Sequence, residues 1–377
     1  MCVCALCQTV LLHFSLAAGF ASPRIVRVLE HTGYLIPGKS KQDGDMSTAT
    51  ADRSWTRLLE TSQWVLDIME GGAQTLMPPS HSAPEGGQGW RSIIRVRMLH
   101  TRVRRRILKQ AAQLKGVYDV HQDGVPINQE DLAATLGTFS VSSLLSLQRL
   151  GIFPTKQERE DYVALWRHVG YYMGVQTNIL QHYFHSARAA DHFEISVIRH
   201  LFGELESDIK LGREPPKSAA IPLLRAVAGR RPFHTPLETH YGIARLLMGP
   251  TLATALRVPF TPSKKSLIIE FLLISVWYPA WFGSWYRKGW EQARTTLARP
   301  YLRKLVIGSM GSNVSKHYGG QEDAKVKVLV DQTAGKGFER KWNMIMFEMV
   351  LVSFAIIAVP SVMIAAALVI SLAGRSV

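Results

Sequence analysis

The sequence is poor in cysteine and lacks the patterns of β-strands. Its three cysteines, Cys2, Cys4 and Cys7, all lie within the first seven of 377 residues. Such a cluster gives neither a disulfide framework nor a metal site built from spaced cysteine pairs. Acylation of these thiols, or no role for them, are the interpretations left. The alternation of apolar and polar residues that marks a half-buried strand is nearly absent, so we expect an all-α fold.

Acidic residues are scarce relative to basic ones. The chain has 29 aspartates and glutamates against 44 lysines and arginines, which gives a formal net charge of +15. A charge of this size suits a nucleic acid or an anionic membrane surface. No nucleic-acid-binding motif is recognisable and many basic residues lie beside hydrophobic segments, so we expect a lipid membrane and no nucleic acid as partner. An apolar content of 47% excludes a chain that is disordered throughout.

One apolar run near the end is long enough to cross a membrane. Residues 349–373 are twenty-five residues without a charge, and a span of about 30 Å of hydrocarbon needs roughly 20. Lys336, Arg340 and Lys341 precede this run and only Arg375 follows it. The positive-inside rule then places the main domain on the cytosolic side. We therefore expect a C-terminal transmembrane helix in the endoplasmic reticulum or a similar membrane.

Two other apolar segments each leave two interpretations open. Residues 1–22 are uncharged, but positive charges follow rather than precede them, so they are either a signal or anchor segment or no span at all. Residues 271–286 form either an interfacial helix or a buried helix of the core. The expected division of the chain is an apolar segment and linker at 1–49, a helical domain at 50–290, an extension at 291–348 and the transmembrane helix at 349–373.

The periodicity of apolar residues predicts a bundle of helices. One helix begins near Ser54, and the glycine- and proline-rich loop at 71–89 leads to a second at 91–115, so the two can pack antiparallel. Asn128 and Thr155 have the sequence context of N-caps for two further helices. The remaining predictions are a helix from Asn128 to Gly151, a helix from Thr155, helical structure at 176–210, a linker at 211–222 and shorter helices at 223–260.

The segment RVRMLHTRVR at 95–104 contains the strongest candidate site. On a helix, His100 lies on an apolar stripe, with Arg97 and Arg104 flanking it on the same side. A haem requires such a set, namely a neutral imidazole for iron and fixed cations for the propionates. The alternative is a core histidine satisfied by a carbonyl, with two arginines that reach solvent. The members of the predicted stripe are Val96, Leu99, His100, Val103 and Ile107.

Two further segments carry a resemblance to a known family. They are HQDGVPINQEDLAATLGTFS at 121–140 and RLGIFPTKQEREDYVALWRHVGYYMGV at 149–175. This pattern resembles the catalytic domain shared by fungal ER-bound oxygenases of the mpaB type and bacterial rubber oxygenase (latex clearing protein), over roughly residues 50–290. The resemblance implies an all-helical, globin-related arrangement around haem b.

The resemblance also implies roles for individual residues. His100 matches the family's haem ligand and Arg97 and Arg104 match the arginines around it, while His168 is the competing imidazole. The family's R-x-x-K-T element matches Arg57 and Thr61, which share a helix face and are expected near bound dioxygen. Glu60 stands where rubber oxygenase has lysine, and a glutamate cannot replace that cation at the distal side of iron.

The expected function is that of a membrane-anchored, haem b-dependent oxygenase. It would use dioxygen to cleave a C=C bond in an apolar, prenyl-type substrate, as in fungal-type secondary metabolism. Glu60 keeps one alternative open, a haem oxygenase of the same fold that hydroxylates or rearranges another metabolite. A second alternative is a non-catalytic, membrane-anchored protein that binds haem or lipid.

Overall fold

The computed structural model describes residues 11–19, 22–32, 48–69, 72–114, 118–210, 220–230, 234–260 and 306. Throughout these ranges the secondary structure is helical, apart from one isolated bridge between Ser80 and Ala83. The expected all-α fold is confirmed for this part of the chain, and its relation to the globins stays a prediction. The elements are η1 (Leu11–Ser15), α2 (Leu16–Gly19), α3 (Pro23–Thr32), α4 (Thr48–Met69), η2 (Ala73–Leu76), α5 (Gln88–Gln113), α6 (Val120–Asp123), α7 (Gln129–Arg149), α8 (Lys156–Met173), α9 (Thr177–Tyr183), α10 (Ala187–Lys210), α11 (Ala220–Val227), α12 (Leu237–Met248) and α13 (Pro250–Ala255).

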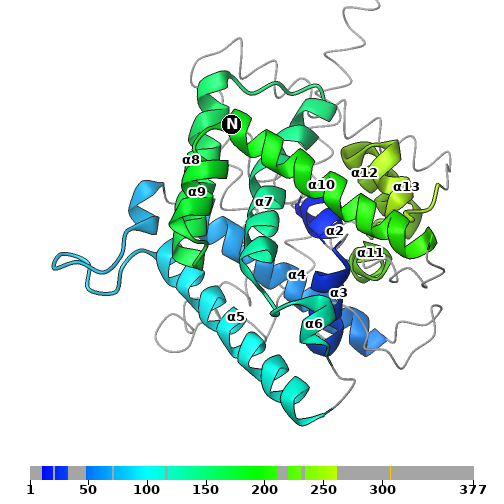
Figure 1. The fold of residues 1–377 in the computed structure, drawn as a ribbon. Coiled ribbons are helices and arrows are strands. Elements are labelled where there is room, and N and C mark those ends of the chain that lie inside the picture. Colours follow the sequence, from blue (N-terminus) through cyan, green and yellow to red (C-terminus); the bar gives the residue numbers. More distant parts are fainter. Residues whose placement is uncertain are drawn as a thin grey trace, which may run out of the picture.

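Helix α7 lies at the centre of the bundle, in contact with α8, α10, α12 and the N-terminal helices (Figure 1). Its sequence TFSVSSLLS is unusually rich in serine for a buried helix. The hydroxyls of Ser140, Ser143 and Ser146 each donate to a backbone carbonyl one turn earlier, at 2.8–2.9 Å. Because these hydroxyls are paired within the helix, the small side chains can be buried without an unpaired polar group.

Both predicted N-caps are confirmed. The Asn128 side chain accepts from the backbone N–H of Asp131, and the Asp131 carboxylate accepts from that of Asn128, which forms a capping box at the start of α7. Thr155 and Glu158 form the same reciprocal pair at the start of α8. These caps pair backbone N–H groups that a helix N-terminus otherwise leaves unsatisfied.

Helices α4 and α5 form the predicted antiparallel pair (Figure 1). Helix α4 begins at Thr48, earlier than the predicted start near Ser54. The buried carboxylate of Asp67 joins the end of α4 to the start of α5, because it accepts from Ser92 Oγ at 2.5 Å and Gln88 Nε2 at 3.3 Å. Gln63 Nε2 donates to the same carboxylate at 2.8 Å. This cluster therefore fixes the register of the two helices.

Two arginines of α5 contact the C-terminal end of α8 and the residues that precede α7. Arg97 Nη1 donates to the carbonyl of Tyr172 at 3.1 Å. Arg104 Nε donates to the carbonyl of Pro126 at 3.1 Å, and its Nη2 donates to that of Ile127. The two segments that carry the family resemblance thus both contact the helix that carries His100.

The side chain of Gln129 joins those two segments directly. Its Nε2 donates to the carbonyl of Gly174 at 3.0 Å, and its Oε1 accepts from the backbone N–H of Gln176 at 2.8 Å. Gly174 ends α8 with a φ of 93°, a left-handed conformation that disfavours side chains with a Cβ. The GVPINQ and YYMGV sequences are therefore explained in part by this contact.

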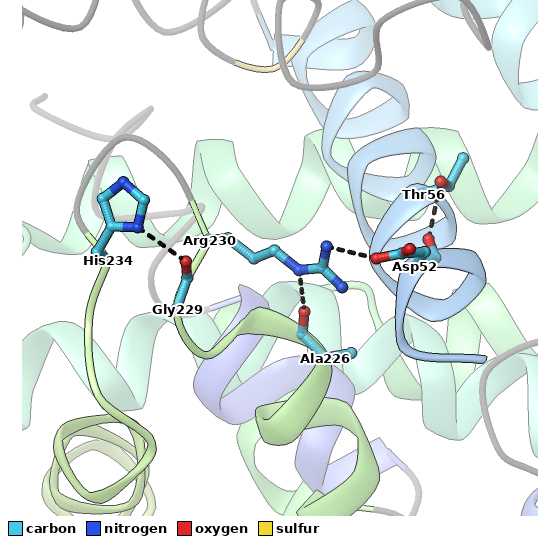
Figure 2. A network of polar contacts seen from close by, with 6 residues as sticks. All are labelled: Asp52, Thr56, Ala226, Gly229, Arg230 and His234. Atoms are coloured by element: carbon cyan, nitrogen blue, oxygen red, sulfur yellow. Dashed lines mark hydrogen bonds and ion pairs between the residues drawn. The ribbon is translucent and has the colours of Figure 1, made fainter. Parts of the chain in front are cut away.

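Arg230, which follows α11, holds the N-terminal end of α4 (Figure 2). Its Nη1 donates to Asp52 Oδ1 at 2.6 Å and its Nε donates to the carbonyl of Ala226 at 2.9 Å. The guanidinium also lies 5.8 Å from the ring centroid of Trp55, a cation–π distance. These contacts hold the N-terminal end of the helix that carries Arg57, Glu60 and Thr61.

The N-terminal helices belong to the same core. Phe14, Ala17 and Val26 are buried in it together with residues of α4, α7 and α12. His13 Nε2 lies 2.8 Å from His240 Nδ1 of α12, inside the core. Residues 11–19 and 22–32, expected as part of an apolar segment and linker, thus contribute to the packing of the helical domain.

Within the described residues, no helix combines the length and the apolar character that crossing a membrane requires. Several sequence predictions fall elsewhere in the chain. The segments at 271–286 and 349–373 lie outside the described residues, as do all of 291–348 except residue 306 and most of the predicted linker at 211–222. The division of the chain into four ranges stays a prediction.

We expect the substitution Gly174→Ala to destabilise the protein by about 1–2 kcal/mol from its left-handed backbone alone. An added Cβ would also lie 3.2 Å from Arg97 Nε, so the arginine would have to move. Gly229→Ala is the matched control, since Gly229 has a φ of 70° but open space around it. Denaturant unfolding followed by circular dichroism should show the larger loss for Gly174→Ala. Equal losses would show that the contact with Arg97 contributes nothing.

Candidate functional site

His100 on α5 combines burial with an unpaired ring nitrogen. The residue is half-buried as a whole, but its Nδ1 is buried and has no hydrogen-bond partner among the described residues. Burial, and to a lesser extent the positive charge of Arg104, lower the pKa of His100 to about 4. The imidazole is therefore neutral at physiological pH, the form that binds a metal. The carbonyl partner that a purely structural core histidine would use is absent from this part of the structure.

The apolar stripe around His100 differs from the predicted one. Ile107 is buried, and Val96 and Val103 are half-buried, as expected. Leu99 is 37% exposed, so its inclusion in the buried stripe was wrong. The reason is geometric, because Leu99 lies about 100° around the helix from His100 and falls on the outward face of α5.

Arg97 and Arg104 flank His100 in sequence, and their guanidinium groups donate hydrogen bonds to backbone carbonyls. Arg97 is exposed and Arg104 is half-buried, and their donors hold Tyr172, Pro126 and Ile127. These contacts give both guanidiniums a positioning role in the fold. Their predicted pairing with haem propionates stays a prediction.

Arg57, Glu60 and Thr61 lie together on one turn of α4. Arg57 Nη1 and Glu60 Oε2 form an ion pair at 2.6 Å, and both side chains are partly buried. Thr61 Oγ1 donates to the carbonyl of Arg57 at 3.0 Å. Glu60 therefore fixes the Arg57 guanidinium and offsets its charge, an effect opposite to that of the lysine expected at this position in rubber oxygenase.

The register of α4 and α5 brings these residues to the level of His100. Ser92 contacts Asp67, and His100 lies about two turns beyond Ser92 along α5. Glu60 lies about two turns before Asp67 along the antiparallel α4. The predicted distal residues and the predicted iron ligand thus occupy the same section of one helix pair.

His168, the competing imidazole, occupies a different environment. It is exposed on α8, and its ring contacts the edge of Tyr172 at a centroid distance of 4.8 Å. Among the described residues, no group of three or more histidines, cysteines, aspartates and glutamates is placed to hold a metal ion. A haem needs one axial imidazole rather than such a cluster, and His100 fits that requirement.

A second set of polar residues was missed by the sequence reasoning. Glu194 of α10 is buried against α7, and Ser142 Oγ donates to its Oε1 at 2.9 Å. Asp67 was also missed, although it organises the α4–α5 contact. A single acidic residue on an otherwise apolar helix face was the available signal for both, as in HFEIS and WVLDIM.

The comparisons with known proteins agree with the resemblance. A family model described as ER-bound oxygenase mpaB/B'/rubber oxygenase, catalytic domain, matches residues 7–277. No curated protein and no solved structure matches the chain. The matched range includes every candidate residue of α4 and α5 and begins before η1.

If the His100 imidazole binds a ligand and does not stabilise the fold, replacing it should stabilise the haem-free protein. We expect His100→Leu to raise the free energy of unfolding by about 1 kcal/mol, because the buried, unpaired Nδ1 is removed. The unfolded imidazole takes up a proton near pH 6.5 and the folded one only near pH 4. The free energy of unfolding of the wild-type protein should therefore fall as the pH is lowered from 6.5 to 4. In His100→Leu this contribution to the pH dependence of stability should be absent.

The control for this measurement is His168→Leu, which removes an exposed imidazole and should change stability by less than about 0.5 kcal/mol. Denaturant unfolding at pH 7 and pH 5 measures both effects. A loss of stability in His100→Leu at pH 7 would contradict the interpretation and assign the imidazole to the core.

Proposed function

The chain belongs to the family of ER-bound mpaB/B' oxygenases and rubber oxygenases, and on this premise we propose that it is a haem b-dependent oxygenase with His100 as the axial ligand of iron. The enzyme is an oxidoreductase of the oxygenase class. The observation that carries the haem assignment is the neutral His100 imidazole, whose buried Nδ1 has no partner in the described part of the chain. Bound haem b would supply a redox-active iron and an open position for dioxygen.

The residues of α4 support a role in orienting dioxygen and substrate. Arg57 is held by Glu60 at 2.6 Å, so its guanidinium has a fixed position in a partly buried environment. Thr61 lies one turn after Arg57 on the same helix, and because its hydroxyl donates to the Arg57 carbonyl, its oxygen is left as an acceptor. A fixed hydrogen-bond donor costs no reorganisation during the reaction, so we assign Arg57 and Thr61 to positioning and Glu60 to holding Arg57.

The proposed reaction is cleavage of a C=C bond in an apolar, prenyl-type substrate, as in fungal-type secondary metabolism. Cleavage places one atom of dioxygen on each carbon and gives two carbonyl groups, so no external reductant is consumed. Hydroxylation of another metabolite is the second candidate, and the replacement of lysine by Glu60 favours it. Oxygen uptake without a reductant supports cleavage, whereas uptake that requires a reductant supports hydroxylation.

An absorption spectrum with haem quantification tests the axial ligand. We expect purified full-length protein to contain one haem b per chain and to show its Soret band, and His100→Ala to lose both. His168→Ala is the control and should retain the wild-type spectrum. Haem-free wild-type protein would overturn the haem assignment, and an unchanged spectrum in His100→Ala would move the ligand to another residue.

The outward face of α5 supports the proposed membrane partner. Met98 and Leu99 are 50% and 37% exposed in the middle of this face. A helical face that combines cations with exposed apolar side chains suits an anionic lipid surface, where the cations meet headgroups and the apolar groups enter the interface. Its exposed residues, which all fall within about 120° of the helix circumference, are Arg95, Met98, Leu99, Arg102, Arg105, Arg106 and Lys109.

Location in the endoplasmic reticulum with the main domain facing the cytosol is part of the same proposal. Because anionic lipids are enriched on the cytoplasmic leaflet, the α5 face could contact that leaflet beside a transmembrane segment at 349–373. An apolar substrate dissolved in the bilayer would then lie close to the enzyme.

Vesicle flotation of the full-length protein tests the α5 face. Replacing Arg102, Arg105 and Arg106 with Gln should weaken binding to phosphatidylserine-containing vesicles by roughly 100-fold, since each of the three cations contributes on the order of 1 kcal/mol. The matched control is Arg53, Arg188 and Arg199→Gln, which removes the same charge from exposed positions of α4 and α10. Equal weakening in both triple variants would show that net charge, not the α5 face, drives binding.

A further inference from the structure

A cavity of about 560 Å³ lies between α7 and α10, away from the α4–α5 pair. Residues of α3, α9 and α13 also line it, and it is partly open to solvent. Volumes of this size are typical of small-molecule sites. Much of the wall is apolar, and the residues that form this apolar part include Ala134, Ala189, Phe193, Val197, Leu252 and Leu256.

Glu194 is one of the residues that line this cavity, and its carboxyl group lies where α10 packs against Gly137 of α7. The side chain is almost completely buried, and Ser142 Oγ donates to its Oε1 at 2.9 Å. Its Oε2 is buried and has no hydrogen-bond partner among the described residues. Burial raises the pKa of Glu194 to about 7, and the hydrogen bond from Ser142 opposes only part of that effect. A buried carboxylate oxygen without a donor is costly to retain.

The packing of α7 is adapted to this carboxyl group. A Cβ on Gly137 would lie 2.1 Å from Glu194 Oε2, so only glycine leaves room for the carboxylate there. Gly137 is inside a buried helix, where glycine is unfavourable by about 1 kcal/mol relative to alanine. A glycine and an unpaired carboxylate oxygen thus meet at the contact between α7 and α10, beside the cavity-lining residue Thr138.

The charges around the cavity are predominantly negative. Glu130, Asp131 and Glu194 line it, against the single guanidinium of Arg24, which already pairs with Glu130 at 2.9 Å. The three lining histidines are His182, His192 and His200. In a chain with a formal net charge of +15, a cavity with an excess of carboxylates is an exception to the overall charge.

We propose that this cavity is a second ligand site that binds a small organic ammonium ion. The protonated nitrogen donates to Glu194 Oε2, and the hydrocarbon part packs against the apolar wall formed by α7, α10 and α13. This assignment goes beyond the oxygenase reaction and does not depend on haem. A cation supplies both the missing donor and the compensating charge, whereas a neutral alcohol supplies only the donor and an anion supplies neither.

Isothermal titration calorimetry on full-length protein tests the site with three probes of equal chain length, n-butylammonium, n-butanol and butyrate. We expect saturable binding of butylammonium, weaker binding of butanol by about tenfold or more, and no binding of butyrate. Glu194→Gln should weaken butylammonium binding by about tenfold or more. Glu238→Gln is the matched control, because Glu238 is exposed on α12 outside the cavity lining.

A second variant tests the cavity without altering the carboxylate. Ala189→Phe places a large side chain against the lining and should abolish butylammonium binding, with circular dichroism confirming the native helix content. The proposal is overturned if wild-type protein shows no saturable binding of butylammonium. It is equally overturned if Glu194→Gln binds as tightly as Glu238→Gln, or if butanol binds as tightly as butylammonium.

Two further measurements distinguish binding at this site from binding to the proposed haem. Amines can coordinate haem iron, so the Soret band is recorded during the titration and should not shift. His100→Ala protein, which lacks the proposed axial ligand, should bind butylammonium with unchanged affinity. Binding that disappears together with haem would assign the amine to iron and overturn the second site, whereas a failure of the haem assignment leaves this test intact.

Discussion

The buried carboxylate of Asp67 is the contact on which the arrangement of the candidate active site depends. By accepting from Ser92, Gln88 and Gln63, it sets how far α4 lies along α5. A shift of one helical turn would move Glu60 about 5.4 Å away from the level of His100. Hydrogen bonds to a buried charge are both directional and strong, so the register is more closely defined than apolar packing alone would make it.

Helix α5 faces three environments at once, and its arginines are divided among them. Arg97 and Arg104 reach sideways to the carbonyls that end α8 and precede α7. Arg102, Arg105 and Arg106 point outward, while His100 and Ile107 face the interior. A helix with so many cations cannot bury an apolar stripe of ordinary width, which explains why Leu99 lies on the outward face.

Local features of the fold were predictable from the sequence, and non-local ones were not. The caps at Asn128 and Thr155 depend on residues three positions apart, so their signals are contained in a few letters of sequence. The Ser142–Glu194 and Asp67–Ser92 contacts join residues distant in sequence, and no local pattern specifies such a pairing. Sequence and family resemblance together made His100 a candidate ligand, but only the structure shows that its Nδ1 has no partner among the described residues and that Glu60 pairs with Arg57.

Buried polar atoms that have hydrogen-bond partners stabilise the fold, whereas those without a described partner are candidates for ligand sites. The serines of α7 donate within their own helix, and Asp67 accepts several donors, so these groups stabilise the fold. His100 Nδ1 and Glu194 Oε2 are buried without described partners. The same holds for several other described atoms, among them Ser15 Oγ, Trp64 Nε1, Trp166 Nε1 and His240 Nε2, although Trp166 stacks on Phe139 and His240 pairs with His13. His100 lies on the α4–α5 pair and Glu194 lines a cavity, so a ligand of the kind proposed at either position would recover free energy that folding leaves unsatisfied.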